Sequence, residues 1–143
     1  MRKLILLLIC VLLIFTGCVN IDPVIDSLPM YEKSEFYTCG EFQDYTDYAK
    51  YYYDWVSEKT VMQSVYFSPV TSENRDELGE FLADFESWVE LSGGELQENY
   101  DFDKTLIGVE DYFYIDAEKG FDNYSVYYFD LEAQILYYFH NNN

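Results

Sequence analysis

The C-terminal third of the chain carries short runs of aromatic and β-branched residues, and this pattern constrains the fold most. The runs cover 111–116, 124–130 and 134–140, and turn-rich segments at 117–123 and 131–133 separate them. Tyr, Phe, Ile and Val favour extended strands, and short runs of them bounded by turns are typical of antiparallel sheets. The pattern therefore predicts a C-terminal three-stranded meander.

Alternation along these strands divides their side chains between two faces. Phe113, Ile115, Val126 and Tyr128 share one face, and Tyr112, Tyr114, Ser125 and Tyr127 share the other. One face should pack on helices. The tyrosine-richer face is either solvated, with its rings paired across strands, or a recognition surface.

Two segments upstream show helical spacing. Thr38 and Glu41 form a capping-box pattern, and the apolar residues that follow, up to Val56, recur on one side of a helix. Tyr48, Tyr51 and Trp55 fall outside that apolar side. They are candidate surface recognition residues for a sugar or peptide, or else half-buried residues at the flank of the helix.

The second helical segment begins near Asn74 and ends at Gly93. Its apolar stripe runs from Leu78 to Val89, opposite acidic residues. A moderate alternation at 61–67 predicts a strand between the two helices. We therefore expect an α+β fold with two amphipathic helices packed on an antiparallel sheet of three to four strands, including the C-terminal three-stranded meander.

The N-terminus has the pattern of a secretory signal peptide. Arg2 and Lys3 precede an unbroken apolar run from Leu4 to Phe15, and Thr16-Gly17 stand directly before Cys18. This ending resembles the lipobox of bacterial lipoproteins. The resemblance covers residues 1–18 only and implies cleavage before Cys18, with lipidation of its thiol. A diacylglycerol supplies two acyl chains, which suffice for stable attachment to the extracytoplasmic face of a membrane.

Charge restricts the partners of the mature chain. Two of the eight basic residues lie in the leader, which leaves six against 27 acidic residues and a net charge of about −21. Nucleic-acid binding requires clustered Lys and Arg, so the composition argues against that class of partner. Cationic ligands would be attracted, although an acidic surface also serves solubility alone.

The body of the chain has few candidate catalytic or metal-binding residues. Cys39 has no partner cysteine in the mature protein and is expected to be buried. The segment from Asp101 begins like a calcium loop but lacks the glycine and glutamate of an EF-hand, which leaves only a loose calcium site open. No catalytic motif is present, so we expect no enzyme and no cofactor. Carboxylate pairs for glycan hydrolysis are the least favoured reading; the candidates are Asp101, Asp103, Glu110 and Asp111.

These observations predict three regions: a cleaved signal peptide at 1–17, an acylated N-terminus and tether at 18–36, and one globular domain at 37–143. The expected function is that of a lipid-anchored, extracytoplasmic, acidic and tyrosine-rich binding module for a protein, peptide or envelope ligand. The alternative is an immunity-type or sequestering lipoprotein that captures a cationic toxin or peptide.

Overall fold

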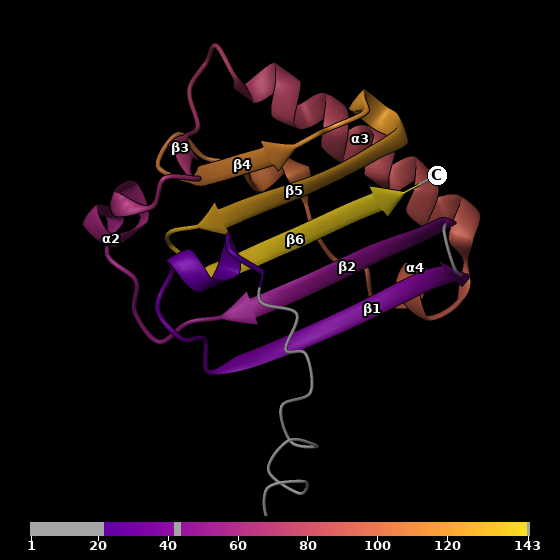
Figure 1. The fold of residues 1–143 in the computed structure, drawn as a ribbon, viewed down its shortest axis with the longest axis horizontal. Helices are drawn as coiled ribbons and strands as arrows, with labels where there is room; N and C mark the ends of the chain where they lie inside the picture. Colours follow the sequence, from indigo (N-terminus) through magenta and orange to yellow (C-terminus); the bar gives the residue numbers. More distant parts are fainter. Residues whose placement is uncertain (1–21, 42–43, 143) are drawn as a thin grey trace, which may run out of the picture.

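A computed structural model of the chain describes residues 22–41 and 44–142, which form one antiparallel sheet with helices packed on it (Figure 1). The strand order is β1-β2-β6-β5-β4-β3. The strands are β1 (Lys33–Glu41), β2 (Asp44–Tyr52), β3 (Ser68–Pro69), β4 (Tyr112–Asp116), β5 (Asn123–Asp130) and β6 (Ile135–Asn142). The longer helices are α2 (Glu58–Gln63), α3 (Arg75–Ser92) and α4 (Gly94–Asn99), and the 3-10 turns are η1 (Ile25–Ser27), η2 (Lys104–Leu106) and η3 (Gly120–Asp122).

The expected fold class is wrong in its sheet and in its first helix. The described residues form six strands rather than three to four, and the segment predicted as the first helix is mostly a β-hairpin. Strands β1 and β2 pair in continuous register from Lys33 and Tyr52 to Glu41 and Asp44.

Burial on both faces of the sheet explains the error. Five consecutive residues of β2, Thr46 to Lys50, are all buried. The two-residue alternation of a half-exposed strand is therefore missing from this stretch, because strands covered on both faces lose that pattern. Asp47 and Lys50, which helical spacing places on a solvent face, are only 8% and 7% exposed.

The segment predicted as a strand at 61–67 also differs, since α2 occupies its first half. Ser57 caps α2, and its hydroxyl accepts a hydrogen bond from the Thr60 backbone N–H at 3.2 Å. This side-chain cap favours a helical turn at its first residues. Val61 is fully buried on the inner side of this helix.

The second predicted helix is confirmed as α3, which covers one face of the sheet with α4. The apolar stripe of α3 is buried against the sheet; it comprises Leu78, Phe81, Leu82, Phe85 and Val89. Phe85 meets Phe139 of β6 edge to face, with ring centroids 5.3 Å apart. Asp76 and Glu77 lie in the first turn of α3, where the helix dipole favours negative charge.

The opposite face of the sheet is covered only in part. Val24, Ile25 and Leu28 pack on it in a hydrophobic cluster that also includes Phe129 and Leu136. In Figure 1 this segment lies in front of the sheet while α3 and α4 lie behind it. The expected tether therefore needs correction within its described part, residues 22–36: the first half packs on the sheet, and β1 begins at Lys33.

The predicted meander is present as β4, β5 and β6. Tyr114 pairs with Tyr127, and Ile115 pairs with Val126. This register confirms the predicted division of the side chains between the two faces. The last strand, β6, also pairs with β2 over eight residue pairs, from Tyr45 and Asn142 to Tyr52 and Ile135. This pairing joins the N-terminal hairpin to the meander in one continuous sheet.

Candidate functional site

The uncovered part of the sheet face that carries residues 22–28 forms an open hollow, which we call the tyrosine groove. It has a volume of about 580 Å³. Its lining residues are Asp22, Pro23, Val24, Phe36, Asp47, Tyr66, Tyr114, Asp116, Tyr127 and Tyr138. Ligand sites in proteins commonly have volumes of this order.

Four tyrosines form a continuous track of rings across the groove. Tyr66 meets Tyr114 at a centroid distance of 5.3 Å, Tyr114 meets Tyr127 at 6.0 Å, and Tyr127 meets Tyr138 at 5.0 Å. The strand register creates this track, because Tyr114, Tyr127 and Tyr138 are direct cross-strand neighbours on one face. Phe36, 54% exposed, extends the apolar surface at the β1 edge.

Three carboxylates border these rings. Asp22 accepts a hydrogen bond from the Tyr127 hydroxyl at 2.8 Å and from the backbone N–H of Val24 at 2.9 Å, so it fixes the packed N-terminal segment. Asp47 is buried, and this burial raises the pKa of its carboxyl. Asp116 is exposed at the end of β4. Among the described residues, no lysine or arginine lines the groove.

Next to the groove, Asp47, His140 and Ser125 occupy one row across β2, β6 and β5. The Ser125 hydroxyl lies 2.9 Å from His140 Nδ1. His140 Nε2 is buried and has no hydrogen-bond partner among the described residues, and burial lowers the pKa of this histidine. A catalytic triad requires the carboxylate to hydrogen-bond the imidazole, so these three residues do not form one in this structure.

The structure separates the three candidate recognition residues. Tyr48 is fully buried beneath α4 and the loop that follows it, and its hydroxyl donates to Asp101 at 2.8 Å. Tyr51 lies half-buried on the opposite face of the sheet and contacts Tyr31. Trp55 follows β2 and is 73% exposed. They do not form a common surface, and Cys18, the predicted lipidation site, lies outside the described residues.

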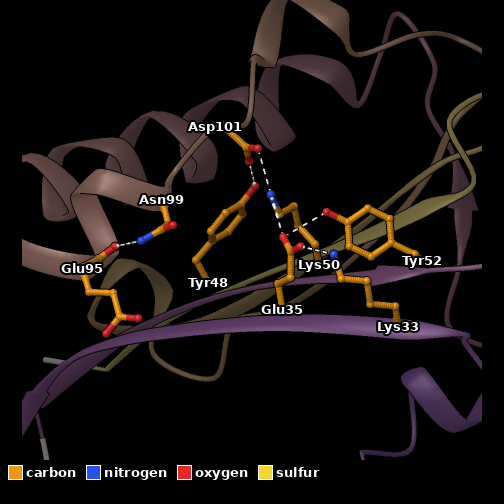
Figure 2. Close-up of polar contacts among 8 residues, drawn as sticks. All are labelled: Lys33, Glu35, Tyr48, Lys50, Tyr52, Glu95, Asn99 and Asp101. Carbon is orange, nitrogen blue, oxygen red and sulfur yellow. Dashed lines mark hydrogen bonds and ion pairs between the residues drawn. The ribbon is translucent and has the colours of Figure 1, made fainter.

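Lys50 is the centre of a network of charges that joins the hairpin to the loop after α4 (Figure 2). Its Nζ lies 2.8 Å from Asp101 and 3.1 Å from Glu35, and Lys33 also contacts Glu35. Burial lowers the pKa of Lys50, but its hydrogen bonds to Asp101 and Glu35 outweigh this effect and leave the pKa raised. Hydrogen bonds from Lys33 and Lys50 lower the pKa of Glu35 to about 2. Each charge has a partner, so the network supports the fold.

Two of the other candidate carboxylates, Asp103 and Asp111, also make structural contacts, and Glu110 makes none with the described residues. Asp103 caps η2 by accepting a hydrogen bond from the Thr105 backbone N–H at 2.9 Å. Asp111 is buried and accepts hydrogen bonds from the Tyr128 hydroxyl and from the backbone N–H groups of Gly108 and Leu131. Residues 22–41 and 44–142 contain no group of three or more His, Cys, Asp or Glu side chains placed to share a metal ion.

Cys39 is half-buried rather than fully buried. It packs beside the core on the α3 side, and its thiol donates a long hydrogen bond of 3.7 Å to the Ser92 carbonyl. In the described part of the chain, no helix is both long and apolar enough to cross a membrane.

The alternation of the C-terminal strands placed two groove residues, Tyr114 and Tyr127, on one face, but it left open whether that face is a recognition surface. It gave no signal for Asp22, Phe36 or Asp47, because segments distant in the chain bring these residues to the same face. No protein family, curated protein or solved structure matches this chain.

Proposed function

We propose that this protein is a lipid-anchored, extracytoplasmic binding module that captures a cationic peptide or protein segment in the tyrosine groove. The observation that carries the proposal is the composition of the groove: three carboxylates and five aromatic rings, with no basic side chain among its described lining residues. The immunity-type alternative is the case in which the captured segment belongs to a cationic toxin.

Two physical effects support a cationic ligand. The face of a tyrosine ring attracts a lysine or arginine side chain, by about 0.5–1 kcal/mol where the site is exposed. The exposed carboxylate of Asp116 adds direct charge attraction, and the net charge of about −21 on the mature chain attracts cations from a distance. Both effects weaken for a neutral or acidic peptide, so the groove discriminates by charge.

Charge removal at one groove residue tests the proposal. Asp116→Asn should weaken binding of a lysine- and tyrosine-containing peptide severalfold, whereas Glu98→Gln should change the affinity little. Both substitutions remove one exposed negative charge, but Glu98 lies on α4, against the opposite face of the sheet. Calorimetric titration of the full chain at low and moderate salt measures the effect. Equal weakening by both variants would show that only net charge matters and would overturn the groove as the site.

The proposed anchor has a separate test. Cys18→Ala should prevent acylation, and the precursor should keep its leader, because cleavage of a lipobox requires the modified thiol. Metabolic labelling with a radioactive or clickable fatty acid, followed by membrane fractionation, measures this. A lipid-labelled, membrane-bound mature form of Cys18→Ala would contradict the proposed lipidation.

A further inference from the structure

A second hollow lies at the end of the sheet where β2 and β5 finish and β6 begins. It has a volume of about 1050 Å³ and shares no lining residue with the tyrosine groove. We call it the Trp55 hollow. Its apolar wall comes from three segments that are far apart in the chain, through Trp55, Leu106, Val109 and Leu131.

Three of the four apolar residues of this wall are largely exposed. Trp55 is 73% exposed, Leu106 is 70% exposed and Val109 is 68% exposed. Single exposed apolar residues are common on protein surfaces, but large ones gathered around one concavity are typical of binding sites. Tryptophan in particular contributes more binding energy at interfaces than most residues.

Two buried polar side chains hold the segments of this wall in place. Asp111 ties the loop at Gly108 to the turn at Leu131, through hydrogen bonds of 2.7 and 3.1 Å from their backbone N–H groups. Gln134 ties that turn to the segment after β2: its side-chain amide donates to the Leu131 carbonyl at 2.7 Å, and its oxygen accepts from the Val56 N–H.

Gln134 adopts a positive φ of 58° to make these contacts, a conformation that is uncommon outside glycine. The hollow is therefore built before any ligand arrives, and a preorganised site loses less conformational entropy on binding.

The rim of the hollow is acidic. Glu110 and Glu132 line it, and neither has a hydrogen-bond or ion-pair partner among the described residues. Asp130 also lines it and uses one oxygen to accept a hydrogen bond from the Ala133 N–H at 2.7 Å. The described lining contains no lysine or arginine. An acidic rim of this kind repels anionic lipid and favours a basic partner.

We propose that the Trp55 hollow is a docking site for a segment of a protein partner that presents a large apolar side chain flanked by lysine or arginine. The apolar side chain packs against Trp55, Leu106 and Val109, and its basic neighbours meet Glu110 and Glu132. This inference does not depend on the tyrosine groove, because the two sites have separate linings.

Tryptophan fluorescence provides a direct test. Trp88 is the second of the two tryptophans, so Trp88→Phe leaves Trp55 as the single reporter. The full chain, in zwitterionic lipid nanodiscs, is titrated with the peptide acetyl-Lys-Lys-Leu-Phe-Lys-Lys-amide, and empty nanodiscs give the background. We expect a saturable blue shift of Trp55 emission, because the ring leaves water. Peptides with serine in place of leucine and phenylalanine, or with glutamate in place of lysine, should give no shift.

Variants then assign the contacts, with labelled peptide and anisotropy as the readout. Trp55→Ala should weaken binding by about tenfold or more, as removal of a tryptophan at the centre of an interface does. Because Trp55 is exposed, the unfolding temperature should remain unchanged and serve as the control for folding. Glu110→Gln with Glu132→Gln should weaken binding, whereas Glu80→Gln with Glu90→Gln, an equal charge change on the exposed side of α3, should not.

Three results would overturn the proposal. One is an equal shift with the serine peptide, which would mean that charge alone attracts the ligand. Another is loss of binding in Asp116→Asn but not in Trp55→Ala, which would move the site to the tyrosine groove. The third is a Trp55 response to envelope glycan fragments with none to the lysine peptide, which would assign the hollow to carbohydrate.

Discussion

Buried polar side chains connect separate segments of this protein through hydrogen bonds and ion pairs. Lys50 joins the hairpin to the loop at Asp101, Asp111 joins two loops at the sheet end, and Gln134 joins a turn to the segment after β2. Each of these three side chains has hydrogen-bond partners, because a buried polar group without a partner carries a large desolvation cost. Substitutions at these residues should therefore affect stability more than substitutions of exposed charges.

Lys50→Met should lower the free energy of unfolding by about 1–3 kcal/mol, because it removes charged hydrogen bonds to Glu35 and Asp101. Lys33→Met is the matched control, since Lys33 is exposed and should change stability by less than about 0.5 kcal/mol. Urea denaturation measures both variants. If the two variants lose the same amount, the network around Lys50 does not stabilise the hairpin.

Glu35 gives a prediction for acidic solution. Its pKa is lowered from 4.5 to about 2 in the folded state, so its contribution to stability is complete above pH 4.5 and is lost as the pH falls toward 2. Glu35→Gln should therefore destabilise the protein near neutral pH, and the difference from the unsubstituted chain should shrink between pH 4.5 and 2. Denaturation curves over this range measure it. A difference that stays constant with pH would contradict the lowered pKa.

The β1–β2 hairpin depends on one glycine. Gly40 has φ of +120°, and a Cβ at this position would lie 2.2 Å from the Asp44 carbonyl oxygen and 2.7 Å from the Tyr45 Cα. No side chain fits there, because both obstacles are backbone atoms. The hairpin supplies β2, which pairs with β6 near the centre of the sheet, so strain at Gly40 would affect the fold beyond the edge strand.

Gly40→Ala should destabilise the protein by more than about 1 kcal/mol, from strain at φ and from the backbone clash. Gly79→Ala is the opposite case, since Gly79 lies within α3 and a Cβ there meets nothing within 4 Å. Alanine should stabilise that helix by up to about 1 kcal/mol. Thermal unfolding followed by circular dichroism measures both, and a shift of the same sign in the two variants would refute this account of Gly40.

The two cores lie on opposite faces of one sheet, and tyrosines contribute to both. Tyr48, Tyr124 and Tyr128 are buried on the α3 side, and Tyr53 and Tyr127 are buried on the other. Burial is the main cause that raises the pKa of all five phenols, and carboxylates beside several of them add to it. The stability of the protein in alkaline solution therefore depends on these residues together.

Ionisation of these phenols should not change the free energy of unfolding below about pH 10. As the pH rises above that value, the free energy of unfolding should fall. The folded state keeps phenol protons that the unfolded chain releases, so high pH favours the unfolded state. The part of the tyrosinate absorbance that comes from these five buried phenols should rise in one cooperative step, which coincides with loss of the circular dichroism signal. Gradual ionisation of all 16 tyrosines without unfolding would contradict the burial described here.

The spacing of apolar residues predicts an element correctly where one of its faces is buried and the other is exposed to solvent. It predicted α3, because its apolar stripe has acidic residues opposite, and it predicted the meander and the two faces of its strands. It failed for β2, whose residues are buried on both faces and include Asp47 and Lys50. The sequence of such a strand lacks the two-residue alternation of apolar and polar side chains by which a strand is predicted.

The sequence alone determined the acidic charge, the signal-peptide pattern before Cys18 and the tyrosine-rich face of the C-terminal strands. The tertiary structure decided the rest of both candidate sites. Pairing of β2 with β6 brings Asp47 beside His140, and packing of residues 22–28 brings Asp22 to Tyr127, across more than ninety residues of chain in each case. Contacts between residues so far apart in the sequence depend on how the strands pair and the segments pack, and local sequence patterns do not predict that arrangement.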